Sequence, residues 1–292
     1  MVTAPDRLLR RLEWKLGRRL DGRLQGAYRT VWHGTGLDFT DLRSYTPEDD
    51  VRHIDWNVTA RLDEPHVRQY TEDREMTAWF VVDRSASMRF GGHEGKQSIA
   101  AELAIGLARL ISQGGNKVGA VLFDNVDRKV VPPRGGRDQI LRIARELTRT
   151  DGVSSKGATT DLSEMLRLAA TTTSRRRSLI FVMSDFIGDP GWERPLAMLT
   201  HRHEVVVIRV VDPAELELPD LGLVLVEDAE TGEQILVDTS DPLLRGRLAE
   251  QVGAREDALA AAMRKAGVRP HRVTTDQDLL AVLIDMVRRS GR

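Results

Sequence analysis

The chain has 292 residues, with 43 Lys and Arg against 44 Asp and Glu, so its formal net charge at pH 7 is −1. A balance this even gives no dominant electrostatic field, and we expect no nucleic-acid partner. Cysteine is absent, which excludes disulfide scaffolds, zinc-thiolate sites, iron–sulfur clusters and cysteine nucleophiles. With 41% hydrophobic and 30% charged residues, the composition is typical of a globular protein with a sizeable core.

The longest apolar runs, such as residues 179–183 and 205–208, are far shorter than the roughly 20 residues that cross a bilayer. The N-terminal residues carry several charges and lack the apolar core of a signal peptide. We therefore expect a cytoplasmic protein, and we do not expect it to contact a membrane.

Residues 1–76 differ from the rest of the chain because they lack long apolar runs. Leucines recur at helical spacing over positions 8–20, among mostly basic residues, and predict an amphipathic helix that ends near Gly22. We expect residues 1–76 to form an arm that packs on a main domain of residues 77–292. The alternative is a helix that binds an anionic membrane or a partner.

From Trp79 onward, apolar runs alternate with amphipathic segments, which is typical of an α/β fold. The apolar runs predict buried strands over residues 78–83, 118–123, 179–184, 204–211 and 271–274. The amphipathic segments predict helices over residues 95–113, 139–148, 162–172, 192–200, 242–266 and 277–289.

Two turn sequences break the alternation. Asp124-Asn125 predicts that the chain folds back into residues 128–131, and Thr231-Gly232 predicts a hairpin between residues 223–226 and 234–237. We therefore expect a doubly wound, mostly parallel sheet with helices on both faces, one antiparallel edge strand and an added β-hairpin.

Three short polar segments lie at the carboxyl ends of predicted strands or in loops beside them. They are Asp83-Arg84-Ser85-Ala86-Ser87, Gly157-Ala158-Thr159-Thr160-Asp161 and Met183-Ser184-Asp185. Ligands of open α/β sheets bind at this edge, where the strand order reverses. The alternative is that the serines cap the following helix while the aspartates accept hydrogen bonds from loop amides.

The side chains of these segments that could hold a metal all present oxygen. They are Asp83, Ser85, Ser87, Thr159 and Asp185. Such ligands suit an octahedral Mg²⁺ or Mn²⁺ and suit zinc or copper poorly. Because hydroxyl ligands are neutral, they leave the metal under-neutralised. An Asp or Glu from a protein partner is then an attractive last ligand.

This combination resembles the metal-ion-dependent adhesion site of von Willebrand factor A domains. The Asp-x-Ser-x-Ser motif is Asp83, Ser85 and Ser87, the threonine is Thr159, and the last aspartate is Asp185. The neighbouring Thr160 is an alternative for the threonine. The resemblance covers residues 77–290 and implies a metal at the carboxyl edge of the sheet.

A second resemblance includes the segment upstream of the first buried strand. Residues 43–56 and 59–61, with residues 82–88, 184–186 and 212–213, resemble the bacterial family called domain of unknown function 58. Proteins of this family are commonly associated with MoxR-type AAA+ ATPases. The resemblance therefore implies an adaptor or chaperone-like role in complex assembly, with such an ATPase or its client as the partner.

The upstream segment itself has two interpretations. In the first, Tyr45, Ile54 and Trp56 pin the arm against the sheet while nearby charged residues form an internal ion-pair collar. These charged residues are Asp49, Asp50, Arg52 and Asp55. In the second, the segment is another partner surface.

No P-loop, dinucleotide-binding fingerprint or Gly-x-Ser-x-Gly motif occurs in the sequence. The three polar segments supply metal-binding oxygens and Arg84, but no general acid or base beside them. We therefore expect a protein-binding module that depends on a metal and is not an enzyme. A metal-dependent hydrolase and a peripheral membrane adaptor are the alternatives.

Overall fold

The computed structural model describes residues 37–46, 49–62, 64–72, 76–89, 95–124, 127–149, 161–173, 176–217, 220–227 and 234–290. The predicted N-terminal helix and both candidate threonines, Thr159 and Thr160, lie outside these residues.

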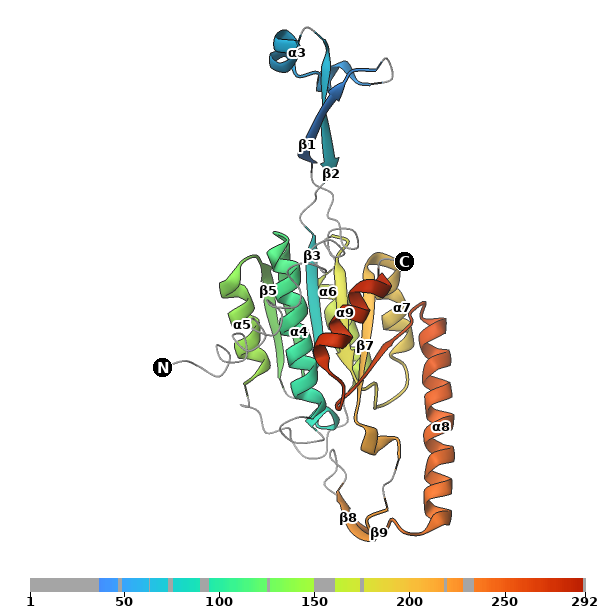
Figure 1. The fold of residues 1–292 in the computed structure, drawn as a ribbon. Helices are drawn as coiled ribbons and strands as arrows, with labels where there is room; N and C mark the ends of the chain where they lie inside the picture. Colours follow the sequence, from blue (N-terminus) through green and yellow to red (C-terminus); the bar gives the residue numbers. More distant parts are fainter. Residues whose placement is uncertain are drawn as a thin grey trace.

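A six-stranded sheet forms the centre of the main body, with the strand order β10-β7-β6-β3-β4-β5 (Figure 1). Its strands are β3 (Thr77–Asp83), β4 (Lys117–Phe123), β5 (Arg128–Arg134), β6 (Leu179–Ser184), β7 (Glu204–Val211) and β10 (His271–Thr274). Neighbouring strands are parallel except for β5, which pairs antiparallel with β4 at one edge. A separate hairpin consists of β8 (Leu223–Glu227) and β9 (Gln234–Asp238). The predicted mostly parallel sheet with one antiparallel edge strand and an added β-hairpin is thereby confirmed.

Helices cover both faces of the sheet (Figure 1). One core joins it to α4 (Lys96–Gln113), α5 (Arg137–Leu147) and α9 (Leu279–Ser290). The other joins it to α6 (Leu162–Thr172), α7 (Glu193–Arg202) and the last turns of α8 (Pro242–Lys265). Successive residues of β3 enter opposite cores, because side chains alternate along a strand.

The helix α4 follows β3 and packs on the central strands. It begins after Gly95 and ends at Gly114, and its buried apolar face carries Ile99, Leu103 and Leu107 at helical spacing. Its first residue, Lys96, is also completely buried. The apolar face therefore places a lysine inside the protein, at the end of the helix nearest the carboxyl edge of the sheet.

Two further strands, β1 (Leu37–Ser44) and β2 (His66–Glu72), form a small antiparallel sheet of their own. Neither strand was predicted, because their sequences contain no long apolar run. Between them lie a short 3-10 helix, η1 (Val51–His53), and the helix α3 (Trp56–Leu62).

The acidic residues of this upstream segment act mainly as turn and helix caps. Asp50 accepts a hydrogen bond from the amide of Arg52 at the start of η1, and Asp55 accepts from the amide of Asn57 at the start of α3. Asp49 forms an ion pair with Arg43, at 2.7 Å. The expectation that Trp56 pins the arm is wrong, since this residue is 68% exposed.

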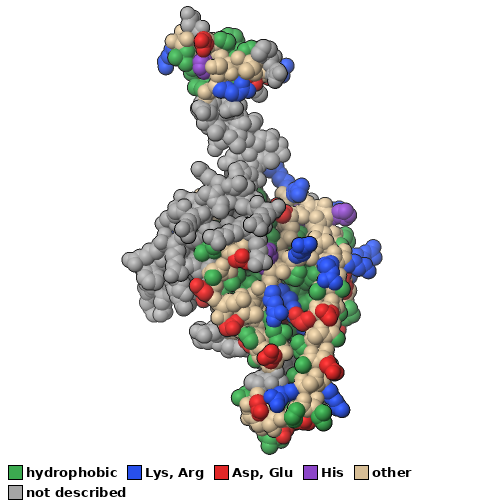
Figure 2. Space-filling view, turned by 45° about the vertical axis from the view of Figure 1, so that its right-hand side comes forward, with side chains coloured by type: hydrophobic (Ala, Val, Ile, Leu, Met, Phe, Trp, Pro, Cys, Tyr) green, Lys and Arg blue, Asp and Glu red, His purple; other side chains and the backbone are tan. Residues whose placement is uncertain are grey.

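The hairpin end of the molecule carries little of the core. Large exposed apolar side chains gather there, as Figure 2 shows at the lower end of the molecule: Leu221, Leu223, Leu225, Val226, Ile235, Leu236 and Leu243. In the adjoining α8, Met263 near the last turn is buried, while the earlier turns lie at the surface. None of the described helices has both the length and the apolar content to cross a membrane.

Gly119 in β4 allows Trp79 to pack directly on the strand. A Cβ at this position would lie 2.9 Å from the Trp79 ring and 3.1 Å from the carbonyl oxygen of Val131. We predict that Gly119→Ala lowers the free energy of unfolding by about 1–3 kcal/mol, because a close-packed core must shift to admit the methyl group.

Gly246→Ala in α8 is the control, because its new methyl group meets nothing within 4 Å. It should be neutral or stabilise the protein by up to about 1 kcal/mol, since alanine favours a helix. Both variants can be measured by denaturant unfolding. Equal stability of Gly119→Ala and the parent would contradict the packing described here.

Candidate functional site

The topology of the sheet brings the two aspartates of the predicted site together. Asp83 ends β3, Asp185 directly follows β6, and these strands are parallel neighbours. They are also the pair between which the strand order reverses, because the chain runs from β3 to β4 on one side and later enters β6 on the other. This reversal is where open α/β sheets bind ligands.

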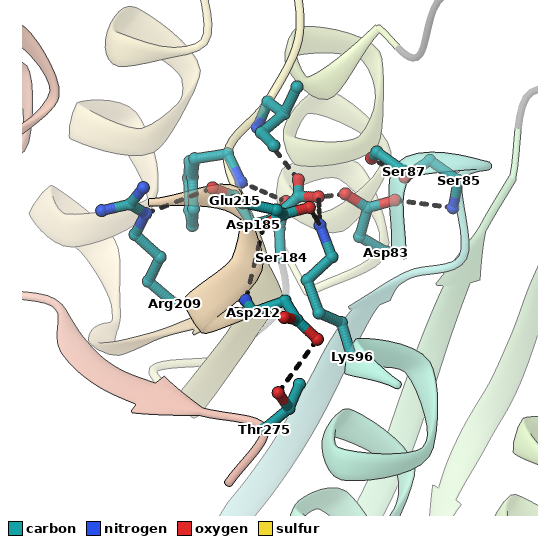
Figure 3. Close-up of polar contacts among 12 residues, drawn as sticks. Asp83, Ser85, Ser87, Lys96, Ser184, Asp185, Arg209, Asp212, Glu215 and Thr275 are labelled. Carbon is teal, nitrogen blue, oxygen red and sulfur yellow. Dashed lines mark hydrogen bonds and ion pairs between the residues drawn. The ribbon is translucent and has the colours of Figure 1, made fainter. Parts of the chain in front are cut away.

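Four of the five predicted ligands lie in one buried cluster (Figure 3). The exposed fractions are 0% for Asp83, 0% for Ser85, 8% for Ser87 and 1% for Asp185. The fifth, Thr159, belongs to the residues that the structure does not describe. The segment that contains it ends at Asp161, which caps α6 by accepting a hydrogen bond from the amide of Glu164.

Asp83 is held by hydrogen bonds to both of its carboxylate oxygens. Oδ1 accepts the amide N–H of Ser85 at 2.9 Å, and Oδ2 accepts the hydroxyl of Ser184 at 2.6 Å. Asp83 thus does accept a loop amide, as the alternative interpretation expected. The hydroxyls of Ser85 and Ser87 instead contact each other, at 3.0 Å.

Ser184 holds the second loop of the site in shape. Besides donating to Asp83, its Oγ accepts the amide N–H of Phe186 at 2.9 Å. Phe186 has a φ of 57°, and it is the only non-glycine residue in the described part of the chain with a positive φ. Its ring packs edge-on against Trp192. A backbone conformation this uncommon needs such support from its neighbours.

Asp185 binds a lysine that the sequence analysis did not assign to the site. Its Oδ1 accepts the amide N–H of Ile187 at 2.9 Å, and its Oδ2 accepts Nζ of Lys96 at 2.6 Å. The same Nζ donates to Oε1 of Glu215 at 2.5 Å. The ammonium of Lys96 therefore bridges two carboxylates (Figure 3).

Glu215 is fixed by a capped 3-10 turn, η4 (Pro213–Glu215), which directly follows β7. Asp212 accepts the amide of Ala214 at 2.9 Å and the hydroxyl of Thr275 at 3.0 Å. Glu215 in return accepts the amide of Asp212, which completes a capping box. The Asp212-Pro213 pair thus holds Glu215 at the site.

Arg209 of β7 links the site to α8. Its Nε donates to the carbonyl oxygen of Asp185 at 3.2 Å, while its two terminal nitrogens each bind the carboxylate of Glu256 at 2.5 Å. The guanidinium of Arg209 thereby lowers the pKa of Glu256. Because Arg209 is almost fully buried, it positions the backbone of Asp185.

Arg84 lies in the loop that follows β3 and ties this loop to α5. It donates to the carbonyl oxygens of Glu146 and Arg149, at 3.4 and 2.5 Å, at the end of α5. Cations favour the carboxyl ends of helices, where carbonyls lack partners. Burial lowers the pKa of Arg84. In the described residues this side chain therefore anchors the loop to α5.

The cluster as a whole carries excess negative charge. Among the described residues, the three carboxylates of Asp83, Asp185 and Glu215 are accompanied by one ammonium, which binds Asp185 and Glu215. These four groups leave two negative charges, which one divalent cation would balance. Burial, and then the negative charge of Asp185, raise the pKa of Asp83 to about 6.

The available donors fit a hard cation. No group of three or more His, Cys, Asp or Glu is placed to hold a metal within the described residues. The candidate ligands are instead two carboxylates and two serine hydroxyls. These oxygens are of the kind that Mg²⁺ and Mn²⁺ accept, together with water, in place of a cage made only of carboxylates.

Ser184→Ala tests the support that this hydroxyl gives to both loops. We predict that the variant loses about 1–3 kcal/mol of unfolding free energy, because a carboxylate and an amide in a buried place each lose a partner. The hydroxyl of Ser240 donates to the exposed Asp238, so Ser240→Ala should change the stability by less than about 0.5 kcal/mol. Similar losses in denaturant unfolding of the two variants would refute the role assigned to Ser184.

Glu256→Gln tests the link through Arg209. At neutral pH we predict a loss of about 1–3 kcal/mol, since a nearly buried guanidinium loses its charged partner and the partial exposure of Glu256 moderates the cost. Because the pKa of Glu256 is lowered from its ordinary 4.5, its ion pair stabilises the fold above that value, and the stabilisation disappears as the pH falls through the lower folded pKa.

The stability difference between the parent and Glu256→Gln should therefore shrink below pH 4.5. Denaturant unfolding across this range measures it. Glu250→Gln on the exposed side of α8 is the matched control and should stay within about 0.5 kcal/mol of the parent. A loss in Glu256→Gln that does not depend on pH would contradict the ion-pair assignment.

Several proteins resemble the chain over most of its length. The uncharacterized protein Rv1480 of Mycobacterium tuberculosis is 38% identical over 286 residues, which cover 97% of this chain and 89% of the relative. The uncharacterized protein MAV169 of Mycobacterium avium is 35% identical over 162 residues, which cover 56% of this chain and 94% of the relative.

Solved structures resemble the chain at low identity. The conserved hypothetical protein BatB from Bacteroides thetaiotaomicron has a TM-score of 0.47 and 17% identity, covering 74% of this chain and 98% of its own. The von Willebrand factor type A structure from Catenulispora acidiphila has a TM-score of 0.37 and 12% identity, covering 77% of this chain and 43% of its own. The fold assignment rests on the strand order described above.

One family model matches the region that contains both the upstream segment and the candidate site. It carries the description "Protein of unknown function DUF58" and matches residues 41–258. This range includes the second half of β1, all of β2, all but the last strand of the six-stranded sheet, and every described residue of the cluster around Asp83. The chain belongs to the DUF58 family.

Proposed function

We propose that this protein is a metal-dependent, non-enzymatic protein-binding module. Asp83, Ser85, Ser87 and Asp185 would hold Mg²⁺ or Mn²⁺, with Thr159 as a further ligand. The bound metal would supply a positive centre for an Asp or Glu of a protein partner. The observation that carries this proposal is the convergence of two aspartates and two serine hydroxyls from two neighbouring strands in one buried cluster.

The surrounding contacts support binding rather than catalysis. Ser184 donates to Asp83, Lys96 is shared by two carboxylates, and Arg84 is bound to backbone carbonyls. Each of these groups has a structural partner. A hydrolase would require a general acid or base beside the metal. No observation on the described residues favours the hydrolase or the membrane adaptor.

The partner that we propose is a MoxR-type AAA+ ATPase or its client, with the protein acting as an adaptor in the cytoplasm. Membership of the DUF58 family supports this choice, because proteins resembling that family are commonly associated with these ATPases. The near-neutral net charge is consistent with a protein partner and gives no attraction to nucleic acid.

Ser85→Ala tests whether the metal and the partner share one site. We predict that the variant keeps its fold and binds Mn²⁺ at least tenfold more weakly in calorimetric titration. Its complex with the purified ATPase of the same organism, measured by biolayer interferometry, should weaken to the extent that a chelator weakens the parent complex. Losing a desolvated charged contact at an interface typically costs about 2–5 kcal/mol, which corresponds to at least a tenfold loss of affinity.

Applying the chelator to Ser85→Ala should weaken the complex little beyond the effect of either change by itself, because both remove the same interaction. Ser240→Ala is the control and should bind both metal and partner like the parent. Unchanged Mn²⁺ binding in Ser85→Ala would refute the metal site. If the chelator does not change the affinity of the complex, the partner binds at a surface other than the metal site.

A further inference from the structure

Lys96 occupies a place that is unfavourable for a lysine. Its side chain is 0% exposed, and it is the first residue of α4. Burial of an ammonium is costly, and the positive end of the helix dipole opposes a cation at this position. The carboxylates of Asp185 and Glu215, at 2.6 and 2.5 Å, offset both effects.

The contacts of Lys96 coincide with the expected metal ligands. Of the two carboxylate oxygens of Asp185, Oδ1 accepts the amide of Ile187, and Oδ2 accepts the ammonium. A metal that binds Asp185 would therefore meet an oxygen already neutralised by Lys96. Because two cations beside one carboxylate repel each other, the ammonium and the metal must compete.

Glu215 gives the ammonium a second partner when it leaves Asp185. The carboxylate of Glu215 is held by the capping box of η4, and it belongs to a different segment from the metal ligands. The Lys96 ammonium can thus stay paired at Glu215 while Asp185 turns to the metal. Neither charge then becomes buried without a partner, which would be the costly outcome.

We infer that Lys96 is a tethered cation that sets the metal affinity of this site. Without metal its ammonium neutralises Asp185 and keeps the cluster folded. When a divalent cation binds, the ammonium is held by Glu215 alone. The inference rests on the proposed metal site, and it makes the affinity for metal lower than the four oxygen ligands alone would give.

Lys96→Met tests the inference, because methionine keeps much of the length of the side chain without its charge. We expect Mn²⁺ to bind the variant at least tenfold more tightly than the parent in calorimetric titration. We also expect the melting temperature of the variant to fall on chelation and to recover with Mn²⁺, because the metal replaces the missing ammonium. The melting temperature of the parent should fall less on chelation than that of the variant.

Glu215→Gln should act in the opposite direction. With Glu215 neutral, the ammonium is held more tightly by Asp185, and Mn²⁺ should bind severalfold more weakly. Lys265→Met, at the exposed end of α8, is the control for loss of a lysine charge and should bind Mn²⁺ like the parent.

The outcomes separate this inference from the proposed function. Equal Mn²⁺ affinity in the parent and Lys96→Met overturns the inference and leaves the metal site standing. If Lys96→Met binds Mn²⁺ and the parent does not, the inference is supported, but the natural protein does not depend on a metal. If neither the parent nor Lys96→Met binds Mn²⁺, the inference and the proposed metal site are both overturned. If Lys96→Met does not fold, Glu215→Gln decides, and an unchanged affinity in that variant overturns the inference.

Discussion

Two aspartates are buried at the carboxyl edge of a parallel sheet, with a partly exposed glutamate beside them, and the rest of the site is arranged around their charge. Parallel pairing of β3 with β6 brings Asp83 and Asp185 to the same edge, and the turn after β7 adds Glu215. The two aspartates are at most 1% exposed. Buried charges must be paired or hydrogen-bonded. Amides, the hydroxyl of Ser184 and the ammonium of Lys96 meet this need only in part.

The same contacts couple distant parts of the chain. From α8, Glu256 holds Arg209, and Arg209 holds the backbone of Asp185. From α4, Lys96 reaches Asp185 and Glu215. The cluster is thereby connected through hydrogen bonds to two helices and to the turn that leads towards the β8–β9 hairpin. A metal at the proposed site would therefore lie beside side chains that are hydrogen-bonded to α4, α8 and η4.

The main body could be predicted from the sequence because its four central strands, β3, β4, β6 and β7, are largely buried and appear as apolar runs. The strands at 179–184, 204–211 and 271–274 have the boundaries that were expected. The strands β1 and β2 were missed, since their sequences, LDFTDLRS and HVRQYTE, mix polar and apolar residues. A strand buried on both faces appears as an apolar run, whereas a strand of mixed composition gives no such run.

The candidate site was predictable where a motif lies in one short segment. Lys96 and Glu215 were missed because their role depends on contacts over 89 and 119 residues of sequence, and lysines are rarely buried. One signal was available. Lys96 continues the apolar face of Ile99, Leu103 and Leu107 at helical spacing, which places it on the buried side of α4. Ser184 was equally visible beside Asp185, but its support of Asp83 requires the pairing of β3 with β6.

We propose that the cluster is a cation site shared by a metal and the ammonium of Lys96. Crystals of the parent protein grown with Mn²⁺, measured near the manganese absorption edge, test it directly. The account predicts an anomalous peak within coordination distance of Asp83, Ser85, Ser87 and Asp185, with Nζ of Lys96 at Glu215 and away from Asp185. An empty cluster at saturating Mn²⁺, or a peak elsewhere with Lys96 still bound to Asp185, would contradict it.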